Sequence, residues 1–414
     1  MDFAGCFWPE RKDVRLKILH WDEMFHPSFG YQINLLAKFQ ARQGHEVTII
    51  SSDRIDEHPK FSSFAGKEDV AKADADYTNA YGVHIIRVPW HCVVSGRVLY
   101  KRGYLEAIRK ARADILLCHT NDTLSAMCIA RAYKKIGIPM VFDNHMLEMA
   151  AKNPFRSLFR LYFRTFITPL IRKNQWVVIR TQNDDYINRC LGIPRQQTPF
   201  LSFGSDTTLF HPDAEARKRF RAEQDISEDA FVIVYAGKLD DAKGGKLLAE
   251  TFVDAFDTRR PVVVVVVGTA DGEYGAEVEA LFAASHNRVL RFPTQKYTDL
   301  APFYQAADLS VFSKQCSLSF YDAQACGLPV VSEGNHINIE RLSHQNGLTF
   351  TPGDRDDFRE KIQRLLDLPE ADVSQMGQNA LEFVKKNYDY ATIAQQYTDI
   401  LQQEYRRFLE KRRG

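Results

Sequence analysis

Six consecutive valines, Val262 to Val267, form the feature that most limits how this chain can fold. Valine is β-branched and favours extended backbone, and a strand without alternating polar residues has no face left for water. Such strands occur in parallel sheets that helices cover on both sides, and six residues are too few to span a membrane as a helix. The run therefore predicts an α/β domain in which this strand is central.

The same alternation of apolar runs and helix-like stretches continues through most of the chain. Short apolar runs predict further strands at 16–20, 47–50, 85–88, 115–118, 140–142, 177–179, 231–235, 289–292, 309–312 and 329–331. Because 414 residues exceed what one core normally holds, and because the rhythm restarts near residue 200, we expect two Rossmann-like domains. The predicted domains are 1–197 and 198–388 with a cleft between them, and the last helical stretch, 389–414, is expected to pack back toward the first.

Composition and motifs exclude several classes of protein. A formal net charge of +1 gives no positive field for nucleic acid, and 45% hydrophobic residues argue against a disordered chain. Seven scattered cysteines without a Cys-x-x-Cys pair indicate neither disulfides nor zinc, and we expect a cytoplasmic protein without a signal peptide. Phosphate-binding P-loops, Gly-x-Gly-x-x-Gly and Gly-x-Ser-x-Gly are absent. Asp74 and Asp76 lie in a polar stretch, so we interpret them as solvated carboxylates and expect no metal.

Several segments, taken in order, resemble retaining glycosyltransferases of the GT-B fold, specifically glycosyltransferase family 4. The resemblance rests on Pro27 to Gly30 with Gly44 to Val47, on 201–212, on 237–244, on 304–308, and on 321–331 with Glu340. It implies a nucleoside-diphosphate-sugar donor held by the second domain and a glycan or polyprenyl-linked acceptor held by the first. It also implies no cofactor or metal, and a place in the synthesis of cell-envelope polysaccharide such as lipopolysaccharide or capsule.

The resemblance implies a set of donor-binding residues. Lys238 and Lys243 follow a predicted strand, where α/β clefts place ligands, and two ammonium groups there would stabilise a departing diphosphate catalytically without a metal. Gly30 would allow close approach of backbone to the donor. The backbone N–H groups of Ser317 and Leu318 would face a phosphate, and Asp322 would accept hydrogen bonds from ribose hydroxyls.

Lys314 departs from the family pattern, because the family has a glutamate there that contacts the transferred sugar. Three interpretations stay open. The donor sugar carries a carboxylate, as a uronic acid does; Lys314 contacts the diphosphate; or the protein has lost transfer activity and is a sugar-nucleotide-binding scaffold. A sugar-nucleotide epimerase of the same fold is a further alternative. His336 and Ile337 also replace the usual Gly-Gly.

In the first domain, His119 follows the strand at 115–118 and matches a family histidine beside the reacting sugar, so we expect it to bond a donor hydroxyl. Asn144 and His145 end the next strand and are candidates for acceptor binding. Further on, Arg156, Arg160 and Arg164 recur every four residues among aromatic side chains. A basic ridge beside an aromatic face is typical of a helix lying on an anionic membrane, although a helix packed on its own domain is the alternative. The first interpretation predicts peripheral attachment at the inner face of the cell membrane.

Overall fold

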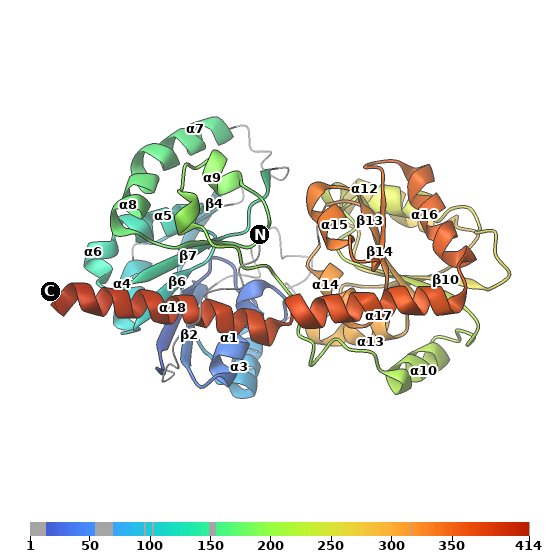
Figure 1. Cartoon of the computed structure of the whole chain (residues 1–414), viewed down its shortest axis with the longest axis horizontal. Coiled ribbons are helices and arrows are strands. Elements are labelled where there is room, and N and C mark those ends of the chain that lie inside the picture. The colour runs from blue at the N-terminus through green and yellow to red at the C-terminus, as the bar shows by residue number, and fades with distance from the viewer. Residues whose placement is uncertain are drawn as a thin grey trace.

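The computed structural model describes residues 14–53, 69–94, 97–101, 103–148, 155–315 and 317–413. Two α/β lobes lie side by side, each built around a six-stranded parallel sheet (Figure 1). This confirms the prediction of two Rossmann-like domains.

The first lobe carries the sheet β3-β2-β1-β6-β7-β8. Its strands are β1 Lys17–Trp21, β2 Glu46–Ser52, β3 His84–Val88, β6 Ile115–Cys118, β7 Met140–Asn144 and β8 Val178–Arg180. Its helices are α1 Gln32–Arg42, α3 Val70–Tyr81, α4 Gly103–Lys110, α5 Leu124–Arg131, α6 Tyr133–Ile136, α7 Arg156–Tyr162, α8 Thr168–Asn174 and α9 Tyr186–Arg189. A hairpin of β4 Trp90–Val94 and β5 Arg97–Tyr100, which the sequence did not predict, lies outside this sheet.

The second lobe carries the sheet β11-β10-β9-β12-β13-β14. Its strands are β9 Phe231–Ala236, β10 Val262–Val267, β11 Arg288–Phe292, β12 Leu309–Phe312, β13 Val330–Glu333 and β14 Gly347–Phe350. Its helices are α10 Ala214–Glu223, α11 Gly245–Thr251, α12 Gly272–Ala283, α13 Ala301–Gln305, α14 Ser319–Ala325, α15 His336–Arg341, α16 Arg355–Asp367 and α17 Glu370–Asn387.

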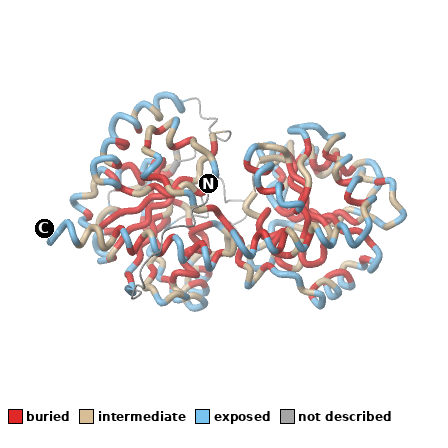
Figure 2. The backbone as a smooth tube through the Cα atoms, in the orientation of Figure 1, coloured by how far each residue is buried: buried red, intermediate tan, exposed pale blue. Residues whose placement is uncertain are grey.

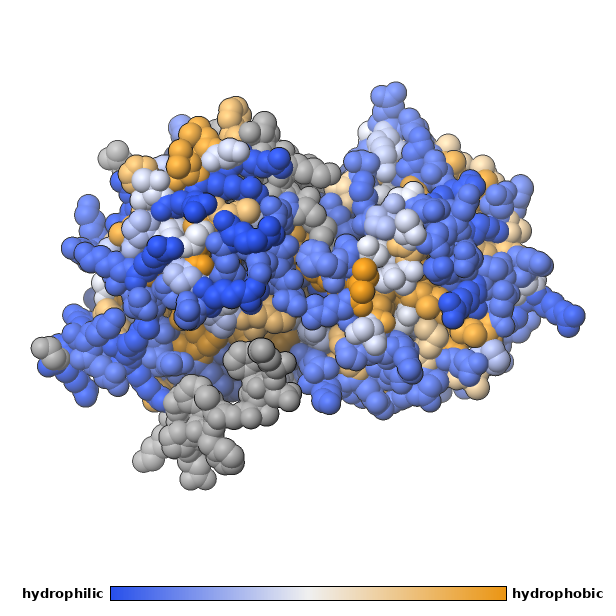
Figure 3. All heavy atoms as spheres, turned by 45° about the horizontal axis from the view of Figure 1, so that its top comes forward, coloured by the Kyte–Doolittle hydropathy of each residue, from blue (hydrophilic) through white to orange (hydrophobic). Residues whose placement is uncertain are grey.

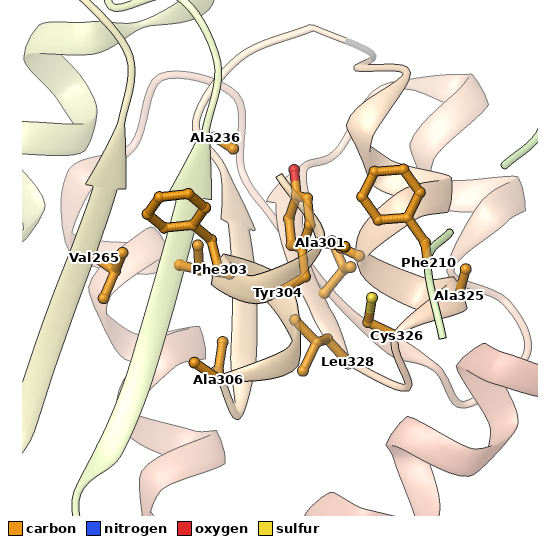
Figure 4. Packing of buried hydrophobic residues seen from close by; sticks show 14 of the residues in the cluster. Phe210, Ala236, Val265, Ala301, Phe303, Tyr304, Ala306, Ala325, Cys326 and Leu328 are labelled. Carbon is orange, nitrogen blue, oxygen red and sulfur yellow. The ribbon is translucent and has the colours of Figure 1, made fainter. Parts of the chain in front are cut away.

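The valine run is β10, which pairs with β9 and β11 and so lies inside the sheet, one strand from its edge. Val263, Val265 and Val267 pack in one cluster, whose ring-rich centre around Phe303 and Tyr304 is drawn in Figure 4. Val264 and Val266 pack in a second cluster on the opposite face. Both faces are buried, as the absence of alternation predicts, and the strands of both lobes are the most continuously buried part of the molecule (Figure 2).

The final helix, α18 Tyr390–Arg413, begins at the junction of the lobes and runs along the first lobe to its outer end (Figure 1). Tyr390, Tyr397 and Leu401 share a core cluster with Leu16 and Ile18 of the first lobe. The helix therefore packs against the domain in which the chain began.

The chain passes between the lobes twice, and the two passages lie against each other. The N–H of Ser205 donates to the Tyr388 carbonyl and the N–H of Tyr390 donates to the Ser205 carbonyl, both at 2.9 Å. A Cβ added at Gly204 would lie 2.1 Å from the Tyr388 carbonyl oxygen and 2.5 Å from Ile393 Cδ1. Glycine is required here because the neighbouring atoms include backbone.

We expect Gly204→Ala to lower the free energy of unfolding by about 1–3 kcal/mol, the usual cost of overpacking a site that cannot relax. Thermal unfolding measures the loss. Gly103→Ala is the matched control, because an added Cβ at Gly103 meets nothing within 4 Å. If both variants unfold at the wild-type temperature, the close packing of the two passages is wrong.

Candidate functional site

The carboxyl ends of β9 and β12 place three lysines on adjacent loops. We use "lysine turn" for residues 237–244, which leave β9 and enter α11. Within it, residues Asp241–Lys243 form a single turn of 3₁₀ helix, and Gly244 has a φ of 70°. Lys238 is exposed and Lys243 is half-buried. The turn is thus a fixed element at the edge of the sheet where α/β proteins bind ligands.

Lys314, which follows β12, lies against this turn. Its Nζ donates to the Asp241 carbonyl at 2.9 Å and lies 3.6 Å from Asp241 Oδ1. The hydroxyl of the preceding Ser313 donates to the Lys243 carbonyl at 2.8 Å. The structure therefore brings Lys314 and Lys243 together, from segments 70 residues apart in sequence.

Two residues that the sequence analysis missed hold the backbone after Lys314. Gln315 has a φ of 60°, and its N–H donates to Glu333 Oε2 at 3.1 Å. Asn338 Nδ2 donates to the Gln315 carbonyl at 3.1 Å and to the Glu333 carbonyl at 2.9 Å. These contacts fix the backbone of Gln315. Ser317 and Leu318 are half-exposed directly before α14. In the sequence, only the position of Glu333, two residues beyond the predicted strand 329–331, pointed to a role at this edge of the sheet.

Asp322 is bonded to other side chains of the protein, and its predicted contact with ribose hydroxyls stays a prediction. It is buried, and its Oδ1 accepts from Ser205 Oγ at 2.7 Å and from the Tyr297 hydroxyl at 3.2 Å. Burial raises the pKa of Asp322 to about 7, against the opposing hydrogen bonds, and the charge of Asp206 adds to the rise. An aspartate is one methylene shorter than the family glutamate, and here it bonds the passage between the lobes.

Gly30 lies against an aromatic ring of the other lobe, and its predicted approach to the donor stays a prediction. A Cβ at Gly30 would lie 1.9 Å from Tyr297 Cδ2, so the tyrosine ring of the second lobe covers this glycine. The N–H of Tyr297 donates to the Ser28 carbonyl at 3.1 Å. The missing side chain of Gly30 thus admits an aromatic ring of the other lobe.

Further contacts join the lobes through α15. Asn183 Nδ2 donates to Glu340 Oε2 at 2.7 Å, and Arg341 Nη2 donates to Gln182 Oε1 at 3.2 Å. His336, which replaces the first glycine of the family pair, lies 3.6 Å from Asp184 Oδ2. Helix α15, which begins at this changed position, thus makes polar contacts with the first lobe.

His119 is buried within a chain of polar side chains, which corrects its predicted position beside the donor. Its Nδ1 lies 2.6 Å from Asp143 Oδ2 and its Nε2 lies 2.9 Å from His20 Nδ1. His20 Nε2 in turn lies 2.8 Å from Gln40 Oε1, and burial together with His119 lowers the pKa of His20 to about 3. Both ring nitrogens of His119 are engaged, so none is left for a sugar hydroxyl.

His145 is partly exposed, whereas His119 is buried. Its side chain is 29% exposed, its Nε2 lies 3.1 Å from Asp143 Oδ1, and its ring meets Phe203 edge-on at 5.3 Å. Burial alone would lower the pKa of His145, but Asp143 raises it above the usual value. The two histidines in turn outweigh burial and lower the pKa of Asp143. Asp143 therefore orients His145 and favours its charged form.

Asn144 is buried, contrary to its expected role in acceptor binding. Its Nδ2 donates to Asn121 Oδ1 at 2.7 Å and its Oδ1 accepts from the Met146 N–H at 3.0 Å. It shapes the loop that carries His145.

Three neighbouring side chains of the first lobe are of types that bind metal ions. In the part of the chain that the structure describes, His119, Asp143 and His145 form a group whose ligand atoms lie within 4.8 Å of one another. His119 Nδ1 lies 2.6 Å from Asp143 Oδ2 and His145 Nε2 lies 3.1 Å from Asp143 Oδ1, so both histidines contact this carboxylate. Asp74 pairs with Arg87 at 2.6 Å and Asp76 with Lys72 at 2.6 Å, so this carboxylate pair is engaged by side chains.

The predicted arginine ridge is interrupted. α7 ends at Tyr162, and the segment Phe163–Ile167 is π-helical before α8 begins. A π-helical turn contains more residues than an α-helical turn. Arginines spaced four residues apart therefore do not stay on one line across this segment. Arg156 and Arg164 are exposed, whereas Arg160 packs over the Tyr186 ring at 5.3 Å. The prediction of a single basic ridge is therefore wrong.

Large apolar side chains are exposed on the same segment. We call them the apolar patch: Phe155, Leu158, Leu161 and Phe166, which are 71%, 66%, 63% and 53% exposed. Figure 3 shows hydrophobic atoms gathered on the upper part of the lobe at the left, the part that carries α7 in Figure 1. Among the described helices, none is both long and apolar enough to cross a bilayer.

Comparison with known protein families matches both lobes. The family described as Glycosyltransferase Family 4 matches residues 30–207, and the family described as Glycosyl transferases group 1 matches residues 216–383.

Among curated proteins, a D-inositol 3-phosphate glycosyltransferase of Segniliparus rotundus is 27% identical over 232 residues, 52% of this chain and 50% of that protein. The chain thus spans about half the length of this relative. A probable sucrose-phosphate synthase of Thermosipho melanesiensis is 22% identical over 94% of this chain and 95% of its own length.

Solved structures share the fold over nearly the whole chain. HepE of Anabaena, solved with UDP and glucose, aligns with a TM-score of 0.72 at 18% identity and covers 94% of this chain and 100% of that one. Sucrose-phosphate synthase of Thermosynechococcus elongatus aligns with a TM-score of 0.67 at 18% identity, covering 94% and 99%.

Proposed function

Because the chain belongs to the group 1 glycosyltransferases of family 4, we propose that it moves a sugar from a nucleoside diphosphate to a glycan or lipid-linked glycan acceptor, with retention of anomeric configuration. The observation that carries this proposal is the lysine turn, where Lys243 and Lys314 are held together at the carboxyl edge of the second sheet. Cell-envelope polysaccharide is the setting we propose for the product.

The chemistry that these residues support is stabilisation of the leaving group. As the bond between the sugar C1 and the diphosphate oxygen breaks, negative charge grows on the phosphate, and nearby ammonium groups lower the energy of that state. The departing oxygen accepts the proton of the acceptor hydroxyl while the acceptor oxygen bonds to C1 on the same face. In this proposal the hydrogen bond to the sugar comes from His145, because His119 is fully engaged elsewhere.

A panel of donors tests the proposal. Since HepE was solved with UDP, UDP-sugars come first, followed by GDP-sugars, each with and without a polyprenyl-linked glycan. We expect release of nucleotide and an anomer-retaining product by NMR, in the presence of EDTA. A change of the donor sugar without release of nucleotide would indicate an epimerase, and nucleotide binding without any reaction would indicate a scaffold subunit.

The position of Lys314 favours contact with the diphosphate over contact with an acidic sugar, because it lies against the lysine turn. We expect Lys314→Glu to weaken the binding of neutral and acidic donors alike by about tenfold, the loss of one charge-assisted contact. Donor titration by calorimetry measures this, with exposed Lys218→Glu on α10 as a control. A loss confined to uronic-acid donors would support the alternative that Lys314 pairs with a sugar carboxylate.

We also propose that the apolar patch contacts a membrane peripherally, with Arg156 and Arg164 beside it. Exposed leucines gain free energy on entering an apolar phase, and nearby arginines favour anionic headgroups. We expect Leu158→Gln combined with Leu161→Gln to weaken binding to anionic vesicles by about tenfold or more, as co-sedimentation would show. Ile339→Gln, which changes a residue 55% exposed on the other lobe, is the control. Equal binding by both variants would contradict this attachment.

A further inference from the structure

A basic cavity lies at the outer end of the first lobe, away from the lysine turn. We call it the outer cavity. It lies between α6, α8 and the last turns of α18, near the C-terminus in Figure 1. Met140, the first residue of β7, and Trp176, just before β8, line it. It therefore sits at the amino ends of these strands, and the interlobe site sits at the opposite ends.

The walls of the outer cavity carry a concentrated positive charge. Five cationic side chains line it: Lys134, Lys173, Arg407, Lys411 and Arg412. They come from three separate segments that the fold brings together. Glu404, the one acidic residue of the lining, forms an ion pair with Arg407, whose Nη2 also donates to the Gln175 carbonyl. Like charges around a concave surface reinforce one another and raise the local concentration of anions.

The other four cations of the lining form no close ion pair within the described part of the chain, although the charge of Lys411 acts on Glu404. Among the residues that the structure describes, no ion pair within 4.0 Å involves Lys134, Lys173, Lys411 or Arg412, whereas many other basic side chains of the molecule are paired. All four residues are exposed, so their charges are open to a ligand from solvent, and a bound anion would reduce the repulsion among them.

The other lining groups suit a phosphate that carries an organic substituent. Trp176 is buried and meets the Tyr133 ring edge-on at 5.3 Å, and the Arg412 guanidinium lies over the Phe408 ring at 5.4 Å. Flat apolar walls thus adjoin the cationic groups. Arginine binds phosphate through paired N–H groups, and lysine binds it as a point charge.

We propose that the outer cavity binds a phosphate group, carried by an anionic phospholipid or by a soluble phosphorylated molecule, independently of the donor site. The proposal does not depend on transfer activity. It assigns Lys173 and Lys411 as the two residues that approach the phosphate from opposite walls, α8 and α18.

Amide hydrogen exchange on the full chain tests this site directly, because it reports which segment a ligand protects. Inorganic phosphate and pyrophosphate are titrated at constant ionic strength, with UDP present to occupy the donor site. In a separate arm, vesicles of phosphatidylglycerol are compared with vesicles of phosphatidylcholine. We expect slower exchange in 133–140 and 404–413 with at least one phosphate source.

Matched double variants separate a built site from diffuse attraction. Lys173→Gln with Lys411→Gln removes two charges from the lining, and Arg406→Gln with Arg413→Gln removes two charges from α18 outside it. We expect the first pair to raise the ligand concentration needed for half-maximal protection at least tenfold. We expect the second pair to change that concentration by less than twofold. Protection by vesicles alone would identify a lipid headgroup, and protection by free phosphate would identify a soluble ligand. Equal losses in both pairs, or no protection of these segments by any probe, would overturn the proposal.

Discussion

Replacing Lys243 by alanine is expected to reduce the rate of sugar transfer by about 10²- to 10³-fold, the usual loss when one preorganised group that stabilises developing charge is removed. Lys243 is suited to this role because its backbone is fixed on both sides. Its N–H donates to Asp240 Oδ1 at 2.9 Å, and its carbonyl accepts from Ser313 Oγ at 2.8 Å. The backbone that carries this side chain is thus held in place before a donor binds. Steady-state transfer with a fixed acceptor measures the effect.

Lys246→Ala is the matched control for Lys243→Ala. Lys246 lies three residues further on, at the start of α11, and is paired with Glu277 at 3.1 Å on the exposed face. We expect its rate to stay within twofold of the wild type and both variants to keep the wild-type unfolding temperature. If Lys243→Ala retains full activity while folded, the lysine turn does not stabilise the leaving group.

The sequence predicted the sheets well because their signals are local. The valine run has no polar position, so its burial on both faces follows directly from the run itself. The small outer elements were missed for a related reason. The hairpin of β4 and β5 lies outside the main sheet, and β14 begins at Gly347 at the edge of its sheet, so neither shows a continuous apolar run.

The site was harder to predict, because its residues depend on contacts between distant segments. In the sequence, a histidine at the end of a strand looks identical whether its side chain is exposed or buried. His119 has partners on both ring nitrogens because His20, on another strand, and Asp143 lie beside it. The role of Gly30 depends on Tyr297 of the other lobe. By contrast, the nearness of Lys243 and Lys314 follows from the parallel topology, since both follow the ends of neighbouring strands, β9 and β12.

Asp322 is expected to make the stability of the protein depend strongly on pH. Burial raises its pKa from the usual 3.8 to about 7 in the folded state, while the unfolded chain loses the proton near 3.8. Between these values the folded state binds one more proton than the unfolded state, so the free energy of unfolding falls as pH rises and levels off above pH 7. A shift of about three units corresponds to a loss of up to about 4 kcal/mol.

Asp322→Asn isolates this contribution, because the amide cannot ionise yet keeps a carbonyl oxygen to accept from Ser205 and Tyr297. We expect the variant to unfold at a higher temperature than the wild type at pH 8 and at a nearly equal temperature at pH 4. The exposed Asp299→Asn variant should instead follow the wild type at every pH. A constant difference between Asp322→Asn and the wild type from pH 4 to pH 8 would show that Asp322 is ionised throughout. In that case its carboxylate would be open to the cleft, and the ribose contact that the sequence implied would be restored in place of the contact with Ser205.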